Sequence, residues 1–201
     1  MSLLSSNSKL KKDGIFNFTL PAYKSQSGLI TCPMAKDCIA NCYARQGCYQ
    51  FSNVRNKHEK NLQATQNNDF SLNMIIDIIE NKAEIVRIHD SGDFYSREYV
   101  AKWLTVIDAM PHVQFYAYTK SFHMFEGLIL PDNFRLIQSC GGTLPVDESK
   151  PHSKVFDSHE ALNKAGYVDA STSDLVALTS DKIGLVYHGT KKHNNNSFIN
   201  K

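Results

Sequence analysis

Along this chain, the spacing of the hydrophobic residues alternates several times between the three or four positions typical of a helix and the shorter spacing typical of a strand. Apolar residues three or four positions apart predict amphipathic helices over 69–82, 96–110 and 158–165. In the first of these helices, the row expected to face the core consists of Leu72, Ile75, Ile76 and Ile79. Each predicted helix is followed by a more extended apolar pattern.

Short runs rich in β-branched and aromatic residues lie between and after the predicted helices. They predict strands over 84–89, 113–119, 134–139, 155–156 and 183–187. A further apolar run, Gly28–Thr31, leads directly into a cysteine and is interpreted as another strand. Strands that alternate with helices in this way indicate βα units and a mainly parallel sheet.

The number of strands limits the choice of fold. About five or six are too few for a closed eight-stranded barrel, which needs roughly 250 residues. We expect an α/β fold, a partial (β/α)6-like barrel of mainly parallel strands in a single domain, with a doubly wound sheet as the alternative. The domain is expected to span 15–190, with a flexible N-terminus at 1–14 and a polar, Asn-rich, disordered tail at 191–201.

Composition excludes several classes of protein. The 201 residues carry a formal net charge of +2 and are 42% hydrophobic, which excludes wholesale disorder, collagen-like chains and coiled-coil fibres. No apolar run approaches the roughly 18 to 20 residues of a membrane span. The N-terminus has no apolar stretch of the length a signal peptide requires. We expect a cytoplasmic protein without a membrane partner.

Cysteine is the most informative residue type in the sequence. Four of the five cysteines lie within 17 residues, and the fifth lies far along the chain. They are Cys32, Cys38, Cys42, Cys48 and Cys140. Thiols stay reduced in the cytosol, so an odd number of clustered cysteines indicates a metal site more than a disulfide framework.

The spacing of the first three cysteines favours iron over zinc. Cys32, Cys38 and Cys42 follow the pattern C-x5-C-x3-C, whereas zinc modules prefer two separated C-x2-C pairs. Three thiolates close together on one loop are typical of a [4Fe–4S] cluster. A zinc site, and buried thiols that bind no metal, are the alternatives.

The sequence offers several candidates for the fourth ligand of such a cluster. Cys140 ends a predicted strand and precedes two glycines, so in a parallel sheet it would emerge at the same edge as Cys32. Cys48 is nearer in sequence to the other cysteines. Water or a small molecule could also take the fourth position. We prefer Cys140.

Polar residues follow several of the predicted strands, which is typical of a site at one edge of a sheet. The candidates for binding a cofactor or substrate are His89, Ser91, Asp93 and Lys120. A helix-capping turn and a solvated loop are the alternatives at these positions. A basic helical surface is formed by Arg45, Arg55, Lys57 and Lys60. Because the net charge of the chain is small, we interpret this surface as a solvated face and do not expect a nucleic-acid partner.

Several segments taken together resemble a known family. The run from Cys38 to Gly47, then Arg87–Phe94, then Phe115–Ser121, is similar to the bacteriophage gene product 88 family. The resemblance extends over about 15–189 and includes Gln138-Ser139 and Leu185 to Gly189. It implies a phage protein located in the cytoplasm of the infected host cell.

The cysteine-tyrosine-alanine element is also, more distantly, similar to radical S-adenosylmethionine proteins. That resemblance implies a [4Fe–4S] cluster on three cysteines at the top of a (β/α)6 partial barrel, with one iron open for S-adenosylmethionine. It would place Cys32, Cys38 and Cys42 as ligands.

The leading hypothesis is a [4Fe–4S] protein that also uses Cys140 and serves in electron transfer, in sensing or as a cluster scaffold, with an unknown electron donor or acceptor. A radical enzyme with three thiolates and S-adenosylmethionine is the alternative, and a zinc-stapled binding module is the second.

Overall fold

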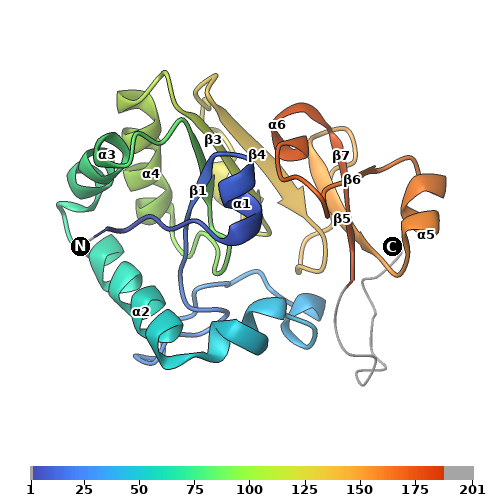
Figure 1. The fold of residues 1–201 in the computed structure, drawn as a ribbon, viewed down its shortest axis with the longest axis horizontal. Helices are drawn as coiled ribbons and strands as arrows, with labels where there is room; N and C mark the ends of the chain where they lie inside the picture. Colours follow the sequence, from blue (N-terminus) through green and yellow to red (C-terminus); the bar gives the residue numbers. More distant parts are fainter. Residues whose placement is uncertain (1, 188–201) are drawn as a thin grey trace.

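Seven parallel strands form one curled sheet in the computed structural model, which describes residues 2–187 (Figure 1). Their order across the sheet is β1-β2-β3-β4-β5-β7-β6, so the first five strands lie side by side in chain order. This confirms the predicted α/β partial barrel. The strands are β1 Ile15–Phe18, β2 Ile85–Ile88, β3 Gln114–Thr119, β4 Phe134–Ser139, β5 His152–Phe156, β6 Val168–Asp169 and β7 Lys182–Val186.

Six α-helices and four short 3-10 turns connect the strands of the described region. The helices are α1 Ser8–Lys12, α2 Ser52–Gln66, α3 Phe70–Glu80, α4 Arg97–Ala109, α5 His159–Lys164 and α6 Val176–Thr179. The 3-10 turns are η1 Asp37–Ile39, η2 Tyr43–Arg45, η3 Gly47–Gln50 and η4 Phe122–Phe125. The predicted helix over 96–110 is confirmed, and Ser96 caps it by accepting a hydrogen bond from the N–H of Tyr99.

Alternate strand residues divide between two hydrophobic clusters, as the period of two in a strand requires. On the side of α3 and α4, Val86 and Ile88 of β2 belong to the larger cluster, together with Trp103 of α4. On the other side, Tyr116 of β3 packs with Leu10 of α1 in a smaller cluster. We call these sides outer and inner; Figure 1 shows α3 and α4 together on one side of the sheet.

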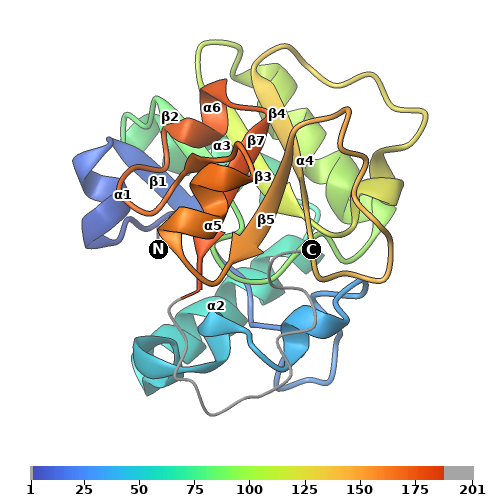
Figure 2. The ribbon, with the colours of Figure 1, turned by 90° about the vertical axis from the view of Figure 1, so that its right-hand side faces the viewer.

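The strand register brings the ends of the central strands to one edge. Ile88, the last residue of β2, pairs with Phe18 at the end of β1, and it also pairs with Ala117 in β3. The residues that follow these strands therefore meet at the same edge, which we call the C-terminal edge. The segment between β1 and α3 lies below this edge in both Figure 1 and Figure 2.

The predicted core face of α3 was wrong at three of its four positions, whereas Ile75 is partly buried and packs against the core. Leu72, Ile76 and Ile79 are each more than 40% exposed, while Phe70 and Met74 are buried. The helix carries a second apolar row, Phe70, Met74 and Ile78, and it is this row that packs against the sheet. Asp77 lies on the buried row, where its carboxylate accepts a hydrogen bond from the N–H of Leu4 at 2.7 Å.

The connection after β1 also differs from the expectation. Gly28–Thr31 is not a strand, because Ile30 forms only an isolated antiparallel bridge with Lys24. β1 and β6 were not anticipated, since they are only four and two residues long. The cysteines therefore follow a long loop that starts at the end of β1.

Residues 2–14, expected to be flexible, form α1 and a segment that packs on the domain. Leu4 is 3% exposed and Leu10 is 1% exposed. The expected disordered tail over 191–201 and the last residues of the expected domain lie outside the described residues. Between residues 2 and 187, no helix is both long and apolar enough to cross a membrane.

A substitution at Gly92 tests how closely the connection after β1 approaches the turn after β2. Gly92 has φ +84°, and an added Cβ would lie 2.5 Å from the Cβ of Leu20. Gly92→Ala should lower the free energy of unfolding through both backbone strain and the clash with Leu20. We expect this loss to be about 1–3 kcal/mol larger than that of a control substitution that has the backbone strain without the clash. That control is Gly127→Ala, at φ +80° with no heavy atom within 4 Å of the added Cβ. Urea unfolding measures both; equal losses would contradict the close approach.

Candidate functional site

Three successive 3-10 turns shape the segment that carries the clustered cysteines. Cys38 lies in η1, Cys42 immediately precedes η2, and Cys48 lies in η3. We call residues 32–48 the cysteine segment. Cys48 is exposed and the other four cysteines are partly buried; all five are free thiols.

Backbone hydrogen bonds attach the cysteine segment to the turn that follows β4. The N–H groups of Lys36 and Cys38 both donate to the carbonyl oxygen of Gly141, at 3.2 and 3.1 Å. Ala35 forms an antiparallel bridge with Gly142. The last contact in the series is the N–H of Thr143, which donates to the carbonyl of Met34 at 2.9 Å. Cys140 is thereby held beside a segment that precedes it by about a hundred residues.

Glycine is required where the two segments meet. Gly141 has φ +80°, a backbone conformation that residues with a side chain rarely adopt. At Gly142 an added Cβ would lie 3.0 Å from the carbonyl oxygen of Met34 and 3.1 Å from the Cβ of Lys120. The two glycines therefore allow the backbone of the cysteine segment to approach the sheet edge closely.

Four of the cysteines interact electrostatically with the side chain of one lysine. Cys32 interacts electrostatically with Cys42, Cys42 with Cys38, and Cys38 with Cys140. Lys120, which follows β3 directly, interacts with each of these four residues. The fold therefore brings together the four cysteines that the sequence favours as ligands, and it leaves Cys48 exposed in η3.

Burial sets the protonation preference of three of these thiols. It raises the pKa of Cys32 to about 12 and raises the pKa of Cys42 and of Cys140. A backbone hydrogen bond at each of the three acts in the opposite direction and favours the thiolate. Free of metal, these thiols keep their protons at neutral pH, so any metal bound by them must displace protons.

The ammonium group of Lys120 supplies a positive charge next to the thiols. Burial acts to lower its pKa, but Cys38 and Asp93 raise it, and the net shift is upward. Its Nζ donates a hydrogen bond to the Oγ of Ser139 at 3.0 Å. Lys120 therefore stays protonated and can balance the charge of thiolates nearby.

Asp93 positions the residues around Lys120. Its carboxylate accepts hydrogen bonds from the Oγ1 of Thr119 at 2.5 Å and from the N–H of Lys120 at 2.9 Å. Its own N–H donates to the carbonyl of Thr31, the residue before Cys32. Burial raises its pKa, and these hydrogen bonds offset the shift only in part. Asp93 thus ties the start of the cysteine segment, through its backbone N–H, to the end of β3, through its carboxylate.

The other two candidates from the turn after β2 lie elsewhere. His89 is 3% exposed, and its Nε2 is hydrogen-bonded with the hydroxyl of Tyr99 at 2.8 Å, within the outer cluster. Ser91 is 4% exposed; its carbonyl accepts from the N–H of Leu20, and its Oγ has no partner in the described structure. The structure therefore brings Asp93 and Lys120 to the thiols and turns His89 into the core.

A buried charged network on the inner side of the sheet was missed by the sequence reasoning. Arg87 lies 3.0 Å from Asp174 and 3.4 Å from Asp90. Hydroxyl groups complete the network, since Tyr116 donates to Asp174 at 2.6 Å and Tyr49 donates to Asp90 at 2.5 Å. Arg87 and Tyr116 occupy strand positions opposite the apolar outer row, and this alternation was the available signal.

Comparison with known proteins supplies the family. The family model for gene product 88 matches residues 1–201. The chain belongs to the gene product 88 family. No curated protein and no solved structure matches it significantly, so the distant similarity to radical S-adenosylmethionine proteins is without support from these comparisons.

The segments on which the family resemblance rests meet at the C-terminal edge of this gene product 88 protein. The run after Cys38, the turn after β2 and the end of β3 are joined there by hydrogen bonds, for example from the hydroxyl of Tyr43 to the carbonyl of Asp90. His188 and Gly189 lie outside the described residues. Among residues 2–187, no three His, Cys, Asp or Glu side chains are close enough to enclose a single metal ion.

A pH titration tests the burial of His89. Burial and the nearby Arg87 charge lower the pKa of His89 from 6.5 to about 3, so between these values the unfolded state binds the extra proton. Stability should therefore fall as the pH drops from 6.5 towards 3, with a contribution of up to about 1.4 kcal/mol per pH unit from this histidine. We expect His89→Asn to flatten the dependence of the unfolding free energy on pH.

The control is Gln63→Asn at an exposed position, which changes no titratable group and should leave the slope unchanged. The experiment compares slopes rather than absolute stabilities, because His89 has φ +68° and asparagine tolerates this conformation differently. A wild-type slope in His89→Asn would contradict the assignment.

Proposed function

We propose that this chain binds a [4Fe–4S] cluster through the thiolates of Cys32, Cys38, Cys42 and Cys140. The observation that carries the proposal is the position of Cys140. Two backbone hydrogen bonds to Gly141 place it against the cysteine segment, where it interacts electrostatically with Cys38. Four thiols from two distant parts of the chain are thus gathered at one edge of the sheet.

The donor set fits a cubane cluster in chemistry and in charge. Thiolates are the usual ligands of [4Fe–4S] clusters, and hydrogen bonds to the sulfurs stabilise them. Backbone groups already hydrogen-bond with Cys32, Cys42 and Cys140. A cubane carries its ligands on four separate irons, so the thiols need not converge as closely as they do around one ion. This is compatible with four cysteines that each interact electrostatically with Lys120 and do not enclose a single-ion site.

The proposed role is one-electron transfer or redox sensing, with an electron donor or acceptor of unknown identity. A cluster with four thiolates has no open iron, and it supplies one-electron chemistry. The residues of this chain hold the cluster, shield part of it from water and place Lys120 beside it. The alternative role is a structural one, in which the cluster only holds the protein segments together and has no redox partner.

Cysteine variants test the ligand set. Anaerobically purified or reconstituted protein should contain about four irons and four sulfides per chain, with a cluster absorption and paramagnetic spectrum. We expect Cys140→Ser to lose most of the cluster or to make it labile. Cys48→Ser is the matched control and should keep the full iron content, since Cys48 is exposed in η3.

Other outcomes would separate the remaining possibilities. A colourless protein that contains zinc would reject the iron–sulfur proposal. An unchanged cluster in Cys140→Ser would reject Cys140 as ligand and leave a three-thiolate cluster with an open iron. In that case S-adenosylmethionine added to the reduced protein should change the paramagnetic signal.

A lysine substitution tests the charge beside the cluster. The Lys120 ammonium favours the additional negative charge of the reduced state, because it interacts with all four cysteines. Lys120→Gln should therefore lower the reduction potential by tens of millivolts, so that the cluster becomes harder to reduce. The exposed Lys164→Gln is the control. A potentiometric titration followed by paramagnetic resonance measures the reduction potential of both variants. The same potential in Lys120→Gln and in Lys164→Gln would contradict the proposed placement of Lys120.

A further inference from the structure

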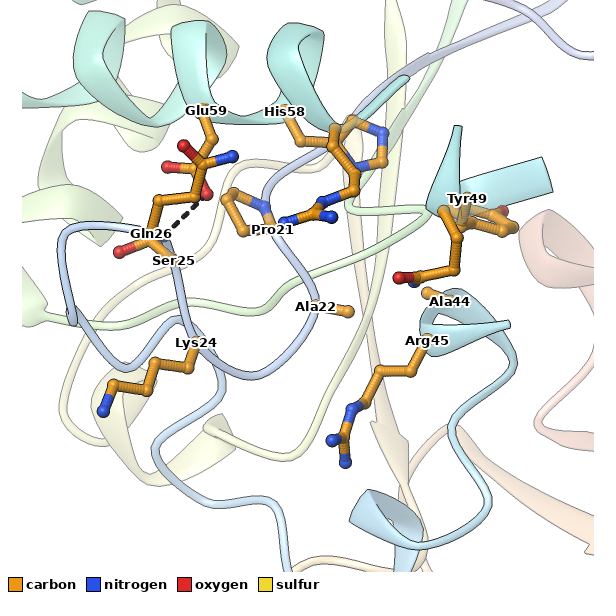
Figure 3. A pocket seen from close by; sticks show the side chains of 12 residues that line it. Pro21, Ala22, Lys24, Ser25, Gln26, Ala44, Arg45, Tyr49, His58 and Glu59 are labelled. Carbon is orange, nitrogen blue, oxygen red and sulfur yellow. Dashed lines mark hydrogen bonds between the residues drawn. The ribbon is translucent and has the colours of Figure 1, made fainter. Parts of the chain in front are cut away.

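A polar pocket of about 330 Å³ lies beside the cysteine segment, outside the group of four thiols. Its walls are the loop over 21–26, the ends of η2 and η3, and the first half of α2 (Figure 3). The volume is at the lower end of the range of small-molecule sites. None of the cysteines lines it.

Positive charge exceeds negative charge among the residues that line the pocket. Lys24, Arg45 and Arg55 are cationic, and Glu59 is the only carboxylate among the lining residues. One oxygen of Glu59 is already engaged, because it accepts the N–H of Gln26 at 2.8 Å. The pocket therefore favours an anion that carries more than one negative charge.

These cations are largely unpartnered within the part of the chain that the structure describes. The side chains of Lys24 and Arg55 form no hydrogen bond or ion pair there, and Arg45 donates only to the carbonyl of Ile39, at 3.1 Å. By contrast, the nearby Lys57 donates to the carbonyl of Leu4 at 3.2 Å and does not line the pocket. The pocket thus retains donors for a ligand.

An unpartnered buried side chain also borders the pocket. His58 is 7% exposed, and its imidazole has no hydrogen bond among residues 2–187, although it contacts the ring of Tyr49 at a centroid distance of 6.1 Å. Tyr49 is held in place by its hydrogen bond to Asp90. The ring nitrogens of His58 are not among the fully buried polar atoms that lack a partner, so the imidazole keeps a hydrogen-bonding atom that a molecule in the pocket can reach.

We propose that this pocket binds a small molecule that carries a phosphate monoester. Phosphate offers a double charge and several acceptor oxygens, which matches guanidinium and ammonium donors better than a single carboxylate does. Lys24, Arg45 and Arg55 are exposed, and Lys24 and Arg45 extend in different directions in Figure 3, so these flexible side chains turn towards the phosphate when it binds. Tyr49 and His58 contact the remainder of the molecule. The site does not depend on iron, because its residues are not the cysteines.

Titration calorimetry of the full chain with adenosine monophosphate, inorganic phosphate and adenosine tests this site. Adenosine monophosphate should bind, inorganic phosphate should compete with it, and adenosine should not bind detectably. Arg55→Gln and Lys24→Gln should each weaken binding by about tenfold or more, as for a lost hydrogen bond to a charged group. Lys60→Gln is the matched control, since Lys60 is exposed on the same helix and does not line the pocket.

A variant with increased affinity keeps the test independent of folding defects. Glu59→Gln removes the only carboxylate of the pocket lining and keeps an oxygen for the N–H of Gln26, so it should tighten the binding of adenosine monophosphate. Equal binding of adenosine and its monophosphate, no binding of any probe at millimolar concentration, or unchanged affinity in Arg55→Gln would each overturn the proposal. The titration is informative whether or not the preparation contains iron.

Discussion

The paired hydrogen bonds from Lys36 and Cys38 to the carbonyl of Gly141 are the interaction on which the arrangement of this protein's site depends. They join a loop that follows the first strand to the turn that follows the fourth. Without them, the thiols would belong to two unrelated parts of the surface. The exchange of backbone groups continues at Gly142 and Thr143, so the contact is a short extension of sheet-like pairing beyond the C-terminal edge.

This attachment buries polar groups, and the electrostatics of the site follow from that burial. A thiol taken out of water holds its proton more tightly, which is the physical reason for the raised pKa of Cys32 and Cys140. The same low-polarity surroundings strengthen the effect of the charge on Lys120. Asp93 then has a positioning role, because its carboxylate is occupied by Thr119 and by the backbone of Lys120.

A charged network on the inner side of the sheet also contacts the C-terminal edge. Arg87 links Asp174, which precedes α6, to Asp90 in the turn after β2. The hydroxyl of Tyr43 connects that turn to the cysteine segment, and the hydroxyl of Tyr49 connects it to the end of η3. A buried charged network of this kind specifies one arrangement of the segments more than it adds stability, because each ion loses its hydration on burial. The pocket on the far side of Tyr49 shares this support, which places an anion site and the thiols on one framework.

The sequence by itself determined the features that depend on near neighbours in the chain. The period of the apolar residues indicated the helix at Arg97–Ala109 and the strand Phe134–Ser139, and the strand-helix alternation indicated a partial parallel barrel. The clustering of three cysteines is a property of the chain alone. The preference for Cys140 used one step of tertiary reasoning, that parallel strands end at a common edge, and in the structure its thiol interacts electrostatically with Cys38 and Lys120.

Only the tertiary structure decided which of two competing surfaces is covered. The helix Phe70–Glu80 has two apolar rows, and the row of Phe70, Met74 and Ile78 is the one that the core covers. The carboxylate of Asp77 on the same helix accepts a hydrogen bond from the N–H of Leu4. His89 follows a strand like Lys120, yet a positive φ turns it into the core, where Tyr99 supplies its partner. Sequence patterns report local spacing, whereas burial depends on the sum of contacts made by segments far apart, and such contacts have no local signature.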